Sequence, residues 1–282
     1  MYKALKEGKV NPNYLVIEEF NENHVGLIHD YLLKFSNKTY NDKMSTYRSF
    51  FNYLIKEGHK VNNVFAEVKM KRTEARTDII SIEDFKRLCE VATEENGWSI
   101  INKGHSKQGR RQLYRDYLVD IWRFALFSGC RPEEIRNVKD IKEDYILVKN
   151  YKVSRSKNED VFRYVVLIKE LHDLVKELIE KNQLAEEDYL LADEETNRVN
   201  MMNVCSLAFS HYWKLISDER RIFYDLRNTY ATRMIEKIGN RFEGVTGLHS
   251  NIRTTSVNYL NTDKILSSIR RTQLFDANKE VI

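Results

Sequence analysis

The chain has 282 residues, of which 42% are hydrophobic and 31% charged, and its formal net charge is +4. This length supports one large domain or two ordinary ones, each with its own hydrophobic core. No run of about 18 apolar residues is present and the first residues lack an apolar signal segment, so we expect a cytoplasmic protein without a membrane span.

The three cysteines, Cys89, Cys130 and Cys205, are odd in number and lie far apart. Their spacing fits neither a disulfide framework nor a zinc site, and it is typical of free thiols in a reducing compartment.

The positive charge is concentrated near the N-terminus. Residues 1–76 carry 13 Lys/Arg and 9 Asp/Glu, whereas the rest of the chain has 33 of each. A basic N-terminal piece suggests a polyanionic partner, although an ordinary basic surface explains this charge equally well.

Two amphipathic helices are expected in this N-terminal piece. Residues 24–35 place four apolar side chains on one helical face: Val25, Ile28, Leu32 and Phe35. A second helix is expected to have Thr39 as its N-cap and to stop at Gly58. Its apolar residues are Tyr47, Phe50, Phe51, Leu54 and Ile55. Two such helices with short connections predict a small helical bundle.

A charged stretch without apolar periodicity, residues 69–78, is expected to be a linker. After it, Ser81 is positioned to cap a new helix, with Asp84 at the capping-box position. The predicted organisation is therefore a helical domain at 1–76 and a larger domain at 79–282.

The larger domain is predicted to be mostly helical, with a small antiparallel sheet. A long helix at 114–129 ends at a glycine. Residues 145–153 and 161–168 are rich in β-branched and aromatic side chains and are expected to be strands, joined by a turn at 154–160. Helices are expected from residue 169 to the end.

The stretch FSGCRPEEI (127–135) places Arg131 and Glu134 on the first turn of a helix that follows a glycine. An arginine beside free backbone N–H groups suits a phosphate. A simple surface ion pair between Arg131 and Glu134 is the alternative.

The predicted hairpin carries Lys152 near the end of its first strand and Lys157 in its turn. A lysine at a hairpin tip can enter a groove and protonate a leaving oxygen. Keeping the turn hydrated is the alternative role of either lysine.

The last candidates lie within residues 223–261. Arg227 starts a helix whose inner face is formed by Leu226, Tyr230 and Met234. His249 is expected to begin another helix, with Tyr259 about three turns further on. Taken singly, a helical tyrosine or histidine indicates an ordinary core or surface residue.

In this order and at about these distances, SGCRPEEI, a hairpin with lysine, LRNTYAT and GLHSNIRTTSVNY resemble the tyrosine recombinase (phage integrase) family. The resemblance covers residues 79–265, and residues 47–65 are similar to the end of that family's core-binding domain. It departs from the family at Tyr224, which stands where a histidine is usual, at Asn228, and in a His249–Tyr259 interval that is one residue longer. Such departures are more frequent in archaeal and viral members.

The resemblance implies a site-specific recombinase that grips duplex DNA with both domains. Tyr259 would be the nucleophile, Arg131 and Arg227 the phosphate clamp, His249 a further donor, and Lys152 the general acid with Lys157 in reserve. Glu134 would orient Arg131 or His249. Neither a metal nor another cofactor is implied.

The same resemblance implies a chain that is monomeric when free and tetrameric on two DNA sites, with the tail at 260–282 docking on a neighbouring protomer. Packing of that tail on its own domain is the alternative. A type IB topoisomerase-like enzyme, a catalytically inactive DNA-binding protein of the same fold, and a helical interaction protein remain open as other functions.

Overall fold

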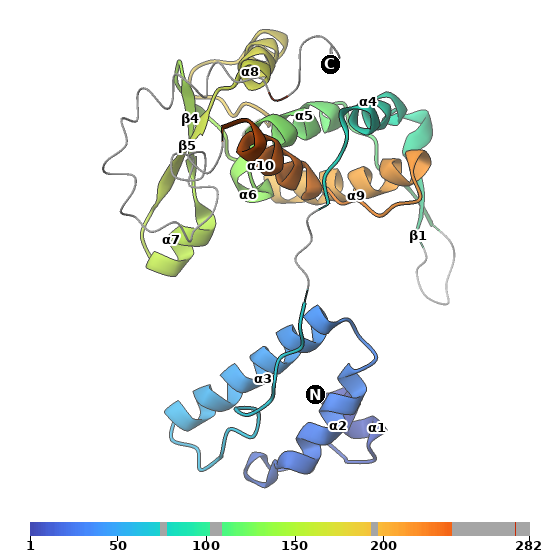
Figure 1. Ribbon diagram of the computed structural model, residues 1–282, viewed down its shortest axis with the longest axis vertical. Coiled ribbons are helices and arrows are strands. Elements are labelled where there is room, and N and C mark those ends of the chain that lie inside the picture. The colour runs from blue at the N-terminus through green and yellow to red at the C-terminus, as the bar shows by residue number, and fades with distance from the viewer. Residues whose placement is uncertain (74–77, 102–108, 193–196, 239–273, 275–282) are drawn as a thin grey trace. The chain divides into compact units, whose positions relative to one another are not determined.

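The computed structural model describes residues 1–73, 78–101, 109–192, 197–238 and 274 (Figure 1). The chain divides into two compact units, Met1–Arg76 and Thr77–Ile282. Each unit has its own hydrophobic core. Among the described helices, none is long and apolar enough to cross a membrane.

The first unit is helical. It contains α1 (Tyr2–Glu7), the 3-10 turn η1 (Ile17–Glu19), α2 (Glu22–Leu32) and α3 (Asn37–Lys56). Its core includes three aromatic rings, Phe20, Phe51 and Phe65, whose centroids are 5.2 to 5.8 Å apart. The predicted small helical bundle is therefore confirmed.

Details of these helices differ from the expectation. The N-cap of α3 is Ser36, whose hydroxyl accepts the Thr39 N–H at 3.3 Å, so Thr39 lies inside the helix. Because α2 ends at Leu32, Phe35 falls beyond it and is exposed. Phe50 and Ile55 are also exposed, since α3 buries only a narrow stripe.

The second unit is built around α5 (Leu118–Ser128), which is buried along nearly its whole length. It packs against α8 (Lys169–Asn182), α9 (Arg198–Ile216) and α10 (Asp225–Ile238), while α4 (Ile82–Val91) packs on α9. Two short helices complete this set, α6 (Pro132–Ile135) and α7 (Tyr151–Lys157). The predicted mostly α unit with a small antiparallel sheet is confirmed.

That sheet has three strands in the order β3 (Asp140–Ile141), β4 (Tyr145–Lys149) and β5 (Phe162–Val166). Strands β4 and β5 are antiparallel, and Val148 lies opposite Arg163. The hairpin prediction is right, but its expected turn is wrong. Residues 151–157 form α7 at the far end of the two strands (Figure 1). The Asn150 side chain accepts the Val153 N–H at 3.4 Å and starts this helix, which ends at a left-handed Asn158.

A second antiparallel ribbon was missed by the sequence interpretation. It consists of β1 (Trp98–Ile101), which follows the 3-10 turn η2 (Glu95–Gly97), and β2 (Gly109–Gln112). Its base is anchored to α9, because His211 Nε2 is 2.8 Å from the Asn96 carbonyl and the Tyr212 hydroxyl donates to the Thr93 carbonyl at 2.8 Å.

Several predicted helix ends are confirmed. The Ser81 hydroxyl accepts the Asp84 N–H at 3.0 Å at the start of α4. Helix α5 ends at Gly129, although it begins at Leu118 and not at Tyr114. The predicted inner face of α10 is buried: Leu226, Tyr230 and Met234.

Thr229 fixes the position of α10 against the chain that enters α4. Its buried hydroxyl accepts the Ile80 N–H at 2.9 Å and donates to the Asp225 carbonyl at 2.7 Å. The contact joins residues that are 149 positions apart, so it closes a large part of the unit.

We expect Thr229→Val to lower the free energy of unfolding by about 1–3 kcal/mol, because the shape is kept while the buried Ile80 N–H loses its acceptor. Chemical denaturation measures this change. Thr46→Val is the matched control, since that exposed hydroxyl donates to the Asp42 carbonyl one turn earlier in the same helix. Equal losses in the two variants would contradict the assignment.

Candidate active site

The turn between α5 and α6 is the foundation of the site. Gly129 has φ +59°, in the left-handed region that favours glycine. A Cβ added there would overlap the ring of Tyr230, so α10 packs directly on the turn. Arg131 follows as the N-cap of α6, in an extended conformation.

Glu134 holds Arg131 in place. Its carboxylate accepts the Arg131 backbone N–H at 2.8 Å and the Arg131 Nη1 at 2.9 Å. The side chain of Glu134 is only 1% exposed, whereas that of Arg131 is 18% exposed. The predicted Arg131–Glu134 pair therefore exists, and it is a partly buried contact rather than a surface one.

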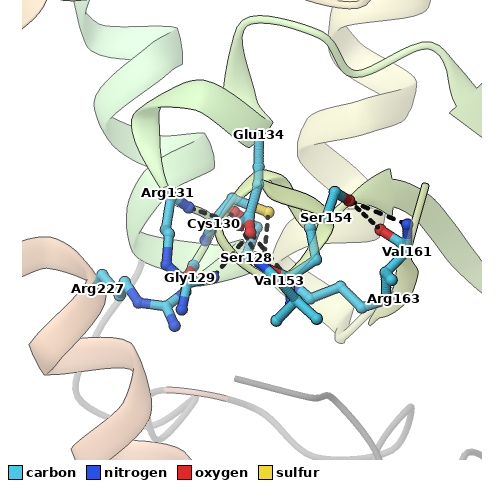
Figure 2. A network of polar contacts seen from close by, with 11 residues as sticks. Ser128, Gly129, Cys130, Arg131, Glu134, Val153, Ser154, Val161, Arg163 and Arg227 are labelled. Atoms are coloured by element: carbon cyan, nitrogen blue, oxygen red, sulfur yellow. Dashed lines mark hydrogen bonds and ion pairs between the residues drawn. The ribbon is translucent and has the colours of Figure 1, made fainter. Parts of the chain in front are cut away.

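A second arginine, Arg163 of β5, reaches the same carboxylate. Its Nη2 lies 2.7 Å from Glu134 Oε2 and 3.4 Å from the Cys130 Sγ (Figure 2). Burial disfavours the charged form of Glu134, but Arg163 and Arg131 outweigh it and hold the pKa of this carboxyl below its usual range. Glu134 is therefore a carboxylate at neutral pH.

Arg227 brings a third guanidinium group to the turn. It is 4% exposed, and its Nη1 donates to the carbonyl of Gly129. Figure 2 shows Arg227 and Arg131 next to each other beside Gly129. Burial, followed by the charges of Arg131 and Arg163, lowers the pKa of Arg227. An anion bound at this place would relieve that repulsion.

The two candidate lysines lie on or at the end of α7. Lys152 is exposed on the first turn of α7, not on a strand as the sequence suggested. Within the described residues no ion pair of Lys152 is found, whereas Lys157 lies 3.6 Å from Glu159. Helix α7 is joined to the region of α6 by two contacts, Asn137 Nδ2 to Tyr151 Oη at 2.7 Å and Arg155 to Glu133 at 2.9 Å.

Tyr224 lies immediately before α10 and is exposed. Its carbonyl accepts the Arg227 N–H at 3.1 Å. Its side chain is close enough to oppose the lowering of the pKa of Arg227. The position that the sequence singled out therefore neighbours the second arginine.

His249 and Tyr259 lie outside the described residues, as does the tail except for Leu274. Leu274 is buried in the core of its own unit, and its N–H donates to Glu170 Oε1 at 2.6 Å. At this one position the tail packs on its own chain.

The contacts of Arg163 with Glu134 and Cys130 were not predicted from the sequence. A signal for a buried arginine was present in FRYVV, because the alternation of a strand directs positions 163 and 165 to the same, buried face. Among the described residues no cluster of three or more metal-ligating side chains occurs.

The model of the phage integrase family matches residues 99–265, which is more than half of the chain. The chain belongs to the phage integrase family. No curated protein sequence matches it significantly.

Solved structures of integrases share its fold at low sequence identity. A lambda integrase (75–356) dimer bound to a COC' core site superposes with a TM-score of 0.61 and 18% identity, covering 87% of this chain and 84% of that one. A lambda integrase tetramer bound to a Holliday junction has the same TM-score and identity, with 89% and 70% covered. The Tn1549 transposon integrase in complex with circular intermediate DNA gives 0.54 and 14%, with 95% and 90% covered.

Gly129→Ala is expected to be strongly destabilising. A left-handed alanine costs about 1–2 kcal/mol, and overpacking against Tyr230 costs about 1–3 kcal/mol more. Thermal unfolding measures the loss. Gly26→Ala is the control, because a Cβ at Gly26 has nothing within 4 Å. A Gly129→Ala protein as stable as the Gly26→Ala protein would contradict the packing described.

Proposed function

We propose that this member of the phage integrase family is a site-specific recombinase that cuts and rejoins duplex DNA through a 3'-phosphotyrosine intermediate. The observation that carries the proposal is the pair Arg131 and Arg227, held at one glycine turn by Glu134 and the Gly129 carbonyl. Two adjacent, permanently charged forks are suited to the non-bridging oxygens of a phosphodiester.

Attack on phosphorus concentrates negative charge on those oxygens in the transition state. Arg131 and Arg227 stabilise that charge, and their fixed positions avoid a reorganisation cost during the reaction. Glu134 acts through Arg131 as a positioning residue, because it lies buried behind the arginine. His249 supplies a further hydrogen-bond donor in this proposal.

Tyr259 is the proposed nucleophile. Its phenol passes a proton to water, its oxygen bonds to phosphorus, and the bond from phosphorus to the 5'-oxygen breaks. Lys152 gives that leaving oxygen a proton. One phosphoester replaces another, so the step needs neither a nucleotide nor a metal. A 5'-hydroxyl of a second duplex then reverses the step and completes strand exchange.

Tyr224 occupies the place where the family usually has a histidine. A phenol hydroxyl can donate a hydrogen bond, so the proposed role of Tyr224 is that of a donor to the phosphate. Its exposed position beside Arg227 is consistent with that role.

The proposed DNA complex uses both units, with 1–76 as the core-binding domain, a linker near 69–78, and 79–282 as the catalytic domain. The relatives are described as a dimer on a core site and a tetramer on a Holliday junction. We propose the same assembly here, a monomer when free and a tetramer on two duplexes. The tail at 260–282 is the proposed link between protomers, and it would have to release the Leu274 contact to act in this way.

Tyr259→Phe tests the function directly, because it removes only the reacting hydroxyl. With a nicked suicide duplex that carries the DNA site, the wild-type chain should form a covalent adduct and recombinant product. The variant should form neither while binding DNA normally in a gel shift.

Three other outcomes would contradict this proposal. An adduct that persists in Tyr259→Phe but is lost in Tyr224→Phe would make Tyr224 the nucleophile. Adduct without recombinants would indicate a topoisomerase, and binding by the wild type without adduct would indicate an inactive DNA-binding protein.

Arg131→Ala and Arg227→Ala should each reduce the single-turnover cleavage rate by about 10²–10³-fold, which is the usual effect of losing one oxyanion donor. DNA affinity should change far less, since one phosphate contact is a small part of a large interface. Rate and affinity falling in parallel would make these residues plain phosphate anchors.

Lys152→Ala should slow cleavage of an ordinary diester but not of a substrate with a bridging 5'-sulfur, because that leaving group needs no proton. Lys157→Ala is the matched control on the same helix and should resemble the wild type with both substrates. If the bridging sulfur restored the cleavage rate of Lys157→Ala but not that of Lys152→Ala, Lys157 would be the general acid.

A further inference from the structure

Helix α6 and the two residues after it contact the β4–α7–β5 segment, here called the lysine arm (residues 145–166). Glu134 binds Arg163 near the α7 end of β5, Glu133 binds Arg155 on α7, and Asn137 donates to Tyr151 at the start of α7. The same short helix carries Arg131 as its N-cap. Arg131 of the phosphate clamp and the lysine arm are thus both held by residues 131–137.

The three attachments are unequal. The Arg155 side chain is 67% exposed and that of Glu133 is 38% exposed, so their pairing is open to water and contributes little. Arg163 and Glu134 are 4% and 1% exposed, and their closest atoms are 2.7 Å apart. Breaking a buried pair leaves an uncompensated buried charge, so among the three polar contacts the loss of this one should disturb the arm most.

We propose that Arg163 is a positioning residue that joins the lysine arm to the phosphate clamp. Its guanidinium binds the carboxylate that orients Arg131, while its backbone belongs to the strand that leads out of α7. Arg163 thereby fixes the distance between Lys152 and the clamped phosphate. The inference rests on the proposed function for its catalytic consequence, but the attachment of the arm can be measured without DNA.

The arm itself is stiff enough to transmit this anchoring. The Asn150 N–H donates to the Val161 carbonyl at 2.7 Å, and the Val161 N–H donates to the Ser154 hydroxyl at 3.0 Å. These contacts attach the N-cap and the middle of α7 to Val161, the residue before β5, as Figure 2 shows for Ser154 and Val161. A shift of β5 at Arg163 therefore moves α7 as a body.

Arg163→Met tests the proposal, because methionine fills a similar space without charge. Amide hydrogen exchange in α7 should accelerate by about tenfold or more, since the anchor of the arm is lost. Exchange in α8 should not change. Single-turnover cleavage should fall by about 10- to 100-fold, the scale of a small misplacement of reacting groups. A bridging 5'-sulfur should restore only part of this rate, because Arg131 is displaced as well.

The pH profile separates positioning from a purely structural role. Glu134 is surrounded by Arg131 and Cys130 of the turn, Arg163 of β5 and Arg227 of α10. Tyr230 of α10 lies beside three of these groups, Cys130, Arg163 and Arg227. Burial raises the pKa of Cys130 and of Tyr230, so both are neutral and the arginines alone favour the carboxylate. Without Arg163 the pKa of Glu134 rises. Activity should then be lost at a higher pH on the acid side than in the wild type, and Arg163→Lys should lie between the two.

Arg123→Met is the matched control. Arg123 also makes a two-pronged pair, with Glu177 at 2.9 Å and 2.9 Å, and it lies on α5 away from this network. Its cleavage rate and α7 exchange should stay at the wild-type level. If Arg163→Met does not fold, the double variant Glu134→Gln, Arg163→Met removes both buried charges and should fold while cleaving slowly.

A folded Arg163 variant with wild-type α7 exchange and wild-type cleavage would overturn the inference. A wild-type chain that fails to cleave any suicide duplex would instead overturn the proposed function. In that case the exchange of α7 and the pKa of Glu134, measured by carboxyl NMR in the Arg163→Met protein, still decide whether Arg163 anchors the arm.

Discussion

The carboxylate of Glu134 is the interaction on which this site depends. It is buried, it binds Arg131 in one direction and Arg163 in the other, and these two arginines come from segments that are far apart in the chain. A glycine turn and the packed ring of Tyr230 place Arg227 beside it. Three guanidinium groups are thus gathered around one carboxylate. This leaves an excess of positive charge at the turn, which a bound anion would offset.

The helices of the second unit hold this arrangement in place. Helix α5 is enclosed by α8, α9 and α10, so its C-terminal turn is rigid. Thr229 fixes α10 against the segment before α4. The packing of Tyr230 on the Gly129 turn and the Arg227 contact with the Gly129 carbonyl then place Arg227 beside Arg131. Rigid support of this kind is what electrostatic preorganisation requires, since donors that must move into place during the reaction lose much of their effect. Lys152, the proposed general acid, does not belong to this turn. It is exposed on α7, within the lysine arm.

Local sequence signals predicted much of this architecture. Gly129 after an apolar helix, the i,i+3 spacing of Arg131 and Glu134, and the apolar stripe of α10 each determine structure within one or two turns, so they could be recognised. The partner of Arg163 could not be recognised in this way, because Glu134 is 29 residues away and only the fold brings the two together.

Two elements differ from the prediction. Residues 151–157 have the β propensity of Tyr151 and Val153, but the Asn150 cap and the contacts to α6 override it and give helix α7. The β1–β2 ribbon was missed because β2, GlyArgArgGln, has almost no strand signal. The places of His249 and Tyr259 remain predictions from the sequence.

In the proposed reaction, Arg131 and Arg227 act on the charge of the scissile phosphate. The most direct measurement compares cleavage of an ordinary duplex with cleavage of one whose scissile phosphate is a neutral methylphosphonate, in the wild type and in Arg131→Ala. If the arginine neutralises developing charge, its removal should slow cleavage of the diester by about 10²–10³-fold and should slow cleavage of the methylphosphonate far less. An equal loss with both substrates would contradict the account and assign Arg131 a role in folding or in general DNA contact.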